Sequence, residues 1–130
     1  MNSRELFVSW AMVIAYVILN SLGAIAIKSV VHRSGAIDPG SARGLAGFVT
    51  STLLSPAVIA GLAAIGLSAC AWIIALSRLP LSIAYPVAVA LNCLIVISAG
   101  LLLYGEAASW NKFAGIFLLL ASLVLLSLDR

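Results

Sequence analysis

Polar side chains at helical spacing inside apolar stretches are the residues of this chain best placed to bind a ligand. In the first apolar stretch, Tyr16, Asn20 and Lys28 recur at multiples of four residues, so a helix would align a phenol, a carboxamide and an ammonium along one side. In a later stretch, Tyr85 and Asn92 share a helix face because they are seven residues apart. Polar groups inside a bilayer are costly unless they are satisfied, so these residues are the first candidates for a binding path.

Each of these residues also has a purely structural interpretation, which the sequence leaves open. Asn20 and Asn92 could instead join neighbouring helices by hydrogen bonds, each worth about 0.6–2 kcal/mol. Lys28 could extend its ammonium to the membrane surface. Trp72, which we add to the candidate path, is equally suited to anchor its helix at the membrane interface.

No acidic residue lies within an apolar stretch, since Glu5, Glu106 and Asp129 are all at the edges of such stretches. A carrier that exchanges protons for cations normally needs a membrane-buried carboxylate for which both compete. Amide and basic groups suit an anionic or phosphate-bearing substrate better. Arg33 and Arg43 follow the first apolar stretch and are further candidates to lie near a phosphate.

Composition indicates the kind of structure that must position these side chains. The 130 residues are 64% hydrophobic and 8% charged, whereas an ordinary soluble domain is about 45–50% apolar and about 25% charged. The mean hydropathy is +1.23. Such a chain cannot cover its own core with polar surface, so we predict an integral membrane protein. The net charge of +3 comes from scattered residues, which gives no electrostatic footprint for nucleic acid.

The charged residues divide the chain into apolar stretches that are long enough to cross a bilayer, which takes about 20 helical residues. We predict a single all-α membrane domain, residues 1–130, with four transmembrane helices and both termini on one side. A long polar segment, about residues 30–48, follows the first helix, and the other connections are short. The predicted helices cover about residues 6–28, 56–77, 81–103 and 110–128.

Prolines and small residues predict local geometry within these helices. Ser55 is placed to cap the second helix, with Pro56 in its first turn. Pro86 lies inside the third helix and predicts a kink, because proline donates no backbone hydrogen bond. Small residues on one face of the second helix favour close packing over lining a cavity, and these are Gly61, Ala64, Ser68, Ala71 and Ala75.

The distribution of basic residues bears on assembly. In a four-helix topology, Arg4, Arg78 and Arg130 lie on one side and Arg33, Arg43 and Lys112 on the other. This balance fixes no orientation by the positive-inside rule, which favours pairing with another copy or a related subunit, although seven basic residues are a small sample. Four short helices also enclose little volume, so we expect a dimer. Gly115 on the last helix is a candidate contact in it.

The sequence contains no pattern that is typical of a metal site, an organic cofactor or covalent catalysis. Cys70 and Cys93 lie inside apolar stretches, where a thiol behaves as a small hydrophobic group. His32 has no cysteine or second histidine near it, so no metal-ligand spacing exists. A glycine-rich phosphate loop and a nucleophile elbow are also absent. We therefore expect no enzyme, no cofactor and no metal.

The second half of the chain resembles the drug/metabolite transporter superfamily, and within it the four-helix proteins grouped with the small multidrug resistance proteins. The matching residues are Leu79-Pro80, Ile83-Ala84-Tyr85, Gly105-Glu106 and Gly115. In the first helix, Gly23 followed by Lys28 also fits. The resemblance implies a four-helix transporter that works as a dimer, with Glu106 in a loop signature.

Two departures from the small multidrug resistance pattern affect the predicted mechanism. The first helix of those proteins holds an essential glutamate, and the matching position here is Asn20. The tryptophan expected shortly after the Ala-Tyr pair is replaced around Ala88. The long first loop, Ala84-Tyr85-Pro86 and Asn92 are more similar to the subunits that flip aminoarabinose-phosphoundecaprenol, a lipid-linked sugar, across the bacterial inner membrane.

We therefore predict a multi-pass transporter of the bacterial inner membrane that flips a polyprenyl-phosphate-linked sugar or a similar anionic amphiphilic lipid. The resemblance implies that Lys28, Arg33 or Arg43 lies near the phosphate. Two other functions stay open, namely a proton-coupled exporter of small or drug-like cations and a membrane assembly or regulatory subunit that transports nothing. The expected partners are a lipid or lipid-linked substrate, the bilayer and an identical or related four-helix subunit, without nucleic acid.

Overall fold

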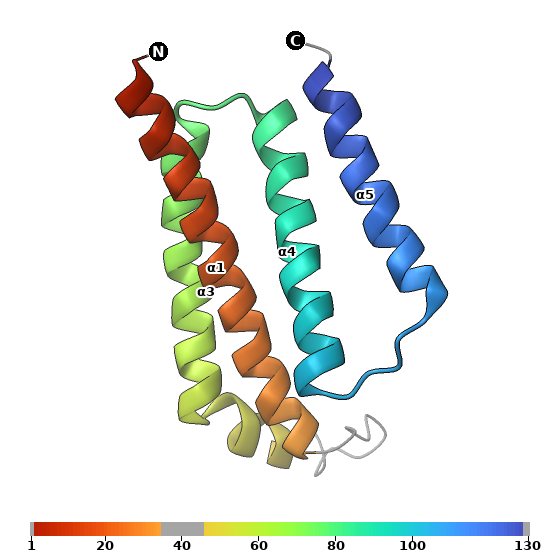
Figure 1. The fold of residues 1–130 in the computed structure, drawn as a ribbon. Helices are drawn as coiled ribbons and strands as arrows, with labels where there is room; N and C mark the ends of the chain where they lie inside the picture. Colours follow the sequence, from red (N-terminus) through yellow and green to blue (C-terminus); the bar gives the residue numbers. More distant parts are fainter. Residues whose placement is uncertain (1, 35–45, 129–130) are drawn as a thin grey trace.

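The structure is a computed structural model that describes residues 2–34 and 46–128, with side chains as far as Leu125. In this part of the chain, four long helices run alternately up and down (Figure 1), namely α1 (Ser3–Ser34), α3 (Pro56–Leu76), α4 (Leu81–Leu103) and α5 (Trp110–Leu128). A short π-helix, η1 (Val49–Leu53), precedes α3. The predicted all-α fold with four helices is confirmed. The start of α1 and the end of α5 lie at the same end of the bundle, as the sequence predicts.

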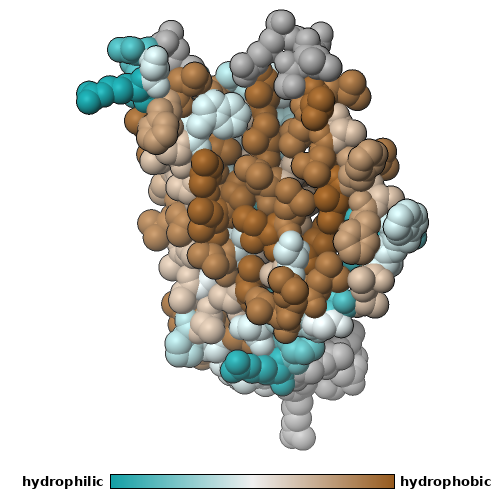
Figure 2. Space-filling view, viewed as in Figure 1, coloured by the Kyte–Doolittle hydropathy of each residue, from teal (hydrophilic) through white to brown (hydrophobic). Residues whose placement is uncertain are grey.

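The surface of the bundle is that of a membrane protein. Helices α1, α3 and α4 are each long and apolar enough to cross a membrane, and α5 is a shorter apolar helix. Figure 2 shows apolar residues over the middle of the molecule, while hydrophilic residues lie mainly towards its two ends. An apolar surface of this extent needs lipid rather than water around it. The chain is therefore a multi-pass membrane protein.

Helix α1 is longer than the sequence predicts, because it continues to Ser34. Neither glycine nor proline occurs between Gly23 and Ser34, and His32 and Arg33 complement the helix dipole in the last turn. At about 1.5 Å per residue, its 32 residues extend roughly 48 Å, beyond the hydrocarbon layer of about 30 Å. The predicted polar segment of residues 30–48 thus begins inside a helix, and residues 35–45 lie outside the described part of the chain.

The start of α3 has the predicted cap. Ser55 is extended, its hydroxyl oxygen accepts a hydrogen bond from the backbone N–H of Val58 at 3.3 Å, and Pro56 begins the helix. A turn at Leu54 separates this cap from η1, so the helical residues before Ser55 do not continue the span. Pro86 lies inside α4, where the kink stays a prediction.

Helices α1 and α3 form the most extensive helix contact of the bundle, because glycines from the two helices meet. A Cβ atom on Gly23 would lie 2.6 Å from the carbonyl oxygen of Gly61, and one on Gly61 would lie 2.9 Å from that of Gly23. Ser68, Ala71 and Ala75 are also buried on α3. The predicted packing role of this small-residue face is therefore confirmed, and Gly23 is its counterpart on α1.

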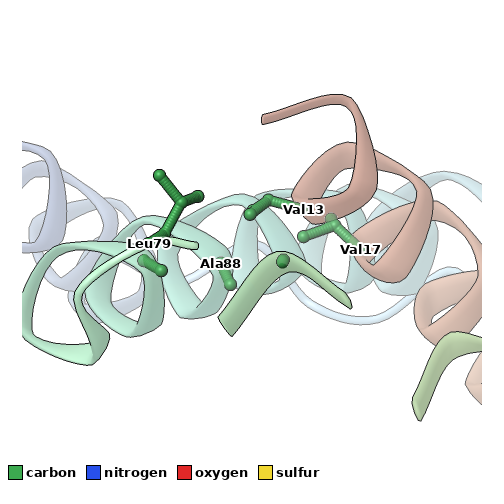
Figure 3. Close-up of a cluster of buried hydrophobic side chains, with 6 residues drawn as sticks. Val13, Val17, Leu79 and Ala88 are labelled. Carbon is green, nitrogen blue, oxygen red and sulfur yellow. The ribbon is translucent and has the colours of Figure 1, made fainter. Parts of the chain in front are cut away.

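A buried apolar cluster closes the end of the bundle where α3 connects to α4. Its members are Val13, Val17, Ala75, Leu79, Ala84 and Ala88. Figure 3 shows Val13 and Val17 of α1 together with Leu79 and Ala88. This cluster joins α1, α3 and α4 into one unit, whereas α5 packs mainly against α4.

Candidate functional site

The predicted site residues of α1 lie at two levels of the bundle rather than in one cavity. Tyr16 and Lys28 are twelve residues apart, which is roughly 18 Å along a helix. Tyr16 contacts Trp72 near the buried apolar cluster, whereas Lys28 lines a cavity towards the opposite end of α1.

At the first level, Trp72 of α3 lies between tyrosines from two other helices. Its ring centroid is 4.7 Å from that of Tyr16 and 6.2 Å from that of Tyr85, which are distances typical of aromatic pairs. Tyr16 and Trp72 are half-buried and pack against the apolar cluster, while Tyr85 is exposed. Three predicted residues are thus brought together, with Trp72 packed among other side chains.

In the middle of the bundle, Asn92 joins α4 to α1. The buried hydroxyl of Ser21 donates a hydrogen bond to Asn92 Oδ1 at 2.8 Å. Asn20, the neighbour of Ser21, is half-buried, and its side chain makes no hydrogen bond to any described residue. Asn92 therefore makes an interhelical hydrogen bond of the kind that its structural interpretation predicts. Its partner Ser21 was missed, although a serine beside an asparagine inside an apolar helix is a signal for such a bond.

We expect Ser21→Ala to lower the free energy of unfolding by about 0.6–2 kcal/mol, because an interhelical hydrogen bond is lost and Asn92 Oδ1 loses its donor. Asn20→Ala is the matched control, since it removes a polar group one residue away that makes no described hydrogen bond. Thermal unfolding of both variants in one detergent measures the difference. An equal loss of stability in the two variants would contradict the assignment.

At the second level, a cavity of about 250 Å³ between α1 and α4 contains the predicted residues Lys28 and Glu106. Its other lining residues are Ala24, Ile25, Val96, Ala99, Gly100 and Tyr104. The volume lies just below the range of about 300–1,000 Å³ for pockets that bind drug-sized ligands. The cavity therefore suits a smaller group, such as one sugar ring.

Local backbone geometry places Glu106 against the end of α4. Gly105 has a φ of 61°, which glycine adopts readily, and the N–H of Glu106 donates to the carbonyl oxygen of Gly100 at 3.1 Å. A Cβ atom on Gly100 would lie 2.9 Å from Glu106 Oε2, so glycine at this position leaves room for the carboxylate. The Gly105-Glu106 signature thus turns the chain and places an acid in the cavity.

Lys112 of α5 forms an ion pair with this acid, with Nζ 3.1 Å from Glu106 Oε2. The two side chains are 35% and 44% exposed, and exposed pairs of this kind are worth about 0–1 kcal/mol. Lys28 is exposed, and no described acidic residue forms an ion pair with it. The cavity therefore contains a cation without a described acidic partner and a weakly paired carboxylate.

Tyr104, which the sequence analysis missed, connects the cavity to α1. Its hydroxyl donates to the carbonyl oxygen of Ile25 at 2.7 Å, and its ring lies edge-on to His32 with centroids 5.6 Å apart. A tyrosine directly before Gly105-Glu106 was the available signal. Arg33 is exposed and does not line the cavity, and Arg43 lies outside the described residues.

The fold and the site together define a class, namely a small multi-pass membrane protein with a charged cavity between two of its helices. Over 120 residues, the chain is 32% identical to the probable 4-amino-4-deoxy-L-arabinose-phosphoundecaprenol flippase subunit ArnE of Pseudomonas aeruginosa. This alignment covers 91% of the chain and 96% of that relative. The chain therefore belongs to the family of these flippase subunits within the small multidrug resistance-like proteins, as the resemblance implies.

Two further relatives align with only part of the chain. The probable flippase subunit ArnF of Shewanella sediminis is 46% identical over 77 residues, and ArnE of Aeromonas hydrophila is 36% identical over 74 residues. These alignments span only 53% and 64% of the two relatives, and 57% of this chain in each case. No protein-family model and no solved structure matches the chain.

Proposed function

We propose that the chain is one subunit of a flippase in the bacterial inner membrane, which moves a polyprenyl-phosphate-linked sugar or a similar anionic amphiphilic lipid across the bilayer. The observation that carries this proposal is the cavity in which the exposed Lys28 has no described acidic partner. An ammonium in such surroundings can bind a phosphate by a charge-assisted hydrogen bond. The relatives support it, because their names describe flippase subunits for a lipid with an amino sugar and a phosphate.

The surroundings of the cavity suit a ligand with a polar head and a hydrocarbon tail. Val96 is 41% exposed and lines both the charged cavity and a neighbouring hollow of about 280 Å³ along α4, which includes Asn92. A lipid can place its head beside Lys28 while its tail stays against α4 and in the bilayer. Only the head must then leave water, which limits the cost of moving charge across hydrocarbon.

Proton-coupled cation export has less support from this arrangement. Within the four long helices of the described chain, the only acidic residue is Glu5, in the first turn of α1. Asn20 occupies the position where the resemblance implies a glutamate in cation exporters, and an amide cannot titrate. These helices thus hold no membrane-buried carboxylate for which a proton and a cation could compete.

We also propose that the working unit is a pair of identical or related chains. The names of the relatives call them subunits and distinguish two kinds, ArnE and ArnF. Helix α5 packs mainly against α4 and leaves Trp110, Phe113 and Phe117 exposed. Gly115 is exposed on another side of α5, and a Cβ atom there would meet nothing within 4 Å, so that side has space for a second helix.

Gly115→Leu is expected to weaken the pair while the single chain stays folded. A Cβ atom at this position meets nothing within 4 Å in the chain, but a leucine would separate two helices that approach closely at glycine. Light scattering of the purified protein in detergent measures the oligomer size. Gly66→Leu is the control, because Gly66 is exposed on α3 and a Cβ there also meets nothing within 4 Å. Unchanged size in both variants would rule out a contact at Gly115.

Transport in proteoliposomes tests the proposed function against its alternatives. The full chain, alone and with a related subunit, is compared on a polyprenyl-phosphate sugar and on a quaternary ammonium ion. We expect the lipid to move with little dependence on pH near neutrality, because the path in α1 contains an amide rather than a carboxylate. Proton-driven export of the ammonium ion that survives Lys28→Ala would instead establish a cation exporter.

A further inference from the structure

We propose that Glu106 binds a primary ammonium group on the sugar of the substrate and thereby makes the cavity selective for an amino sugar over the matching neutral sugar. This inference rests on the proposed function and deepens it. It assigns a ligand group to the second charged residue of the cavity. Three features of the structure lead to it, namely the charges of the cavity, the position of the carboxylate and the partner that the carboxylate now has.

The charged side chains that line the cavity are one of each sign. Lys28 comes from α1, and Glu106 comes from the loop between α4 and α5. A ligand with only a phosphate would be repelled by the carboxylate, and a ligand with only a cation would be repelled by the ammonium. A head group that has both an anion and a cation matches both residues. The cavity that both residues line has a volume of about 250 Å³, which accommodates a single ring.

The carboxylate of Glu106 is positioned before any ligand arrives. The hydrogen bond from its own N–H to Gly100 and the positive φ of Gly105 fix the backbone on which it is carried. The absent side chain of Gly100 supplies the space that Glu106 Oε2 fills. An acceptor that is already in place loses little conformational entropy when a ligand binds, which favours recognition over a merely solvated surface charge.

The ion pair with Lys112 shows that the carboxylate of Glu106 can bind a primary ammonium group. The Nζ of Lys112 is a primary ammonium 3.1 Å from Glu106 Oε2, and a protonated amino sugar presents the same group. Among the described residues, no other donor bonds to the carboxylate side chain. Because the pair is partly exposed and weak, an ammonium on a ligand held by Lys28 can replace Lys112. Lys112 therefore occupies the place of the substrate amine and competes with it.

Equilibrium binding to the full chain in lipid nanodiscs tests this inference. The two ligands are a polyprenyl-phosphate amino sugar and the same lipid with a hydroxyl group in place of the amine. We expect the natural chain to bind the amino sugar about tenfold more tightly, which is the lower end of the effect of one charge-assisted hydrogen bond because Lys112 competes for the carboxylate. Glu106→Gln should bring the ratio of the two affinities close to one. Lys112→Gln should raise this ratio, because the competing ammonium is removed.

The two substitutions are expected to change the ratio of the two affinities in opposite directions. This difference distinguishes recognition of the substrate from an ion pair that is only structural. If the Glu106–Lys112 pair only held the loop, both variants would change the ratio in the same way or leave it unchanged, and the inference would be wrong. Equal affinities of the natural chain for both lipids, or binding of neither, would also overturn it. Equal transport of both lipids would refute the selectivity while the flippase proposal stands. Preferential binding without transport would refute the flippase and leave the recognition by Glu106 intact.

Discussion

Lys28→Ala is expected to slow the movement of a phosphate-bearing lipid by about 10- to 150-fold, which corresponds to the loss of a charge-assisted hydrogen bond worth about 1.5–3 kcal/mol. Lys28 lines the cavity with an exposed ammonium and has no described acidic partner, so its removal leaves the phosphate without this contact. Initial rates in proteoliposomes, normalised to the amount of folded protein, measure the effect.

Two further variants define what the Lys28 result means. Lys28→Arg keeps the positive charge and should retain a large part of the rate, although arginine presents a planar fork rather than a point charge. Arg4→Ala removes an exposed cation from the other end of α1 and should have little effect. If Lys28→Ala transports the lipid as fast as Arg4→Ala, the chain does not bind phosphate through Lys28.

Gly61→Leu is expected to give a large loss of stability, because the residue is in the close contact between α1 and α3. A Cβ atom alone would lie 2.9 Å from the carbonyl oxygen of Gly23, and backbone cannot move aside as a flexible side chain can. Overpacking commonly costs about 1–3 kcal/mol, and a leucine between two backbones falls at the upper end of this range or beyond. The separation of α1 from α3 would also disturb the wall of the cavity that α1 supplies.

Thermal unfolding and size-exclusion profiles in detergent compare Gly61→Leu with Gly66→Leu. The second variant adds the same side chain to the same helix at an exposed glycine with open space around it. We therefore expect Gly66→Leu to keep nearly the natural midpoint of unfolding and Gly61→Leu to unfold earlier or to aggregate. Similar midpoints for the two variants would show that the glycines of α1 and α3 are not in close contact in the membrane protein.

The sequence was sufficient to predict the helices because hydropathy and charge decide them locally. Pro56 and its cap Ser55 mark a helix start by their own chemistry, and the uncharged stretches have the length that a bilayer requires. The end of α1 was harder to predict. The residues after Lys28 are polar enough for a loop, yet they contain no helix breaker as far as Ser34, so the helix continues.

The arrangement of the site was only partly predictable, because it depends on contacts between distant segments. Spacing placed Tyr16 and Lys28 on one side of a helix, but a stripe of this length spans two levels with different neighbours. Lys28 of α1 and Glu106 of a loop line one cavity, and Lys112 of α5 pairs with Glu106, an arrangement that no local pattern encodes. The roles of these residues in transport therefore stay predictions that experiment must test.

The most direct test of the proposed flippase is the transbilayer movement of the lipid itself. Sealed vesicles whose other lipids carry no primary amine are prepared with a polyprenyl-phosphate amino sugar in both leaflets. A membrane-impermeant amine reagent is added outside, and the labelled lipid is separated from labelled protein before it is measured. With the chain and a related subunit in the membrane, we predict that the lipid of the inner leaflet also reacts, and that Lys28→Ala slows this second phase. An inner pool that stays protected in vesicles with correctly folded protein would contradict the proposed function.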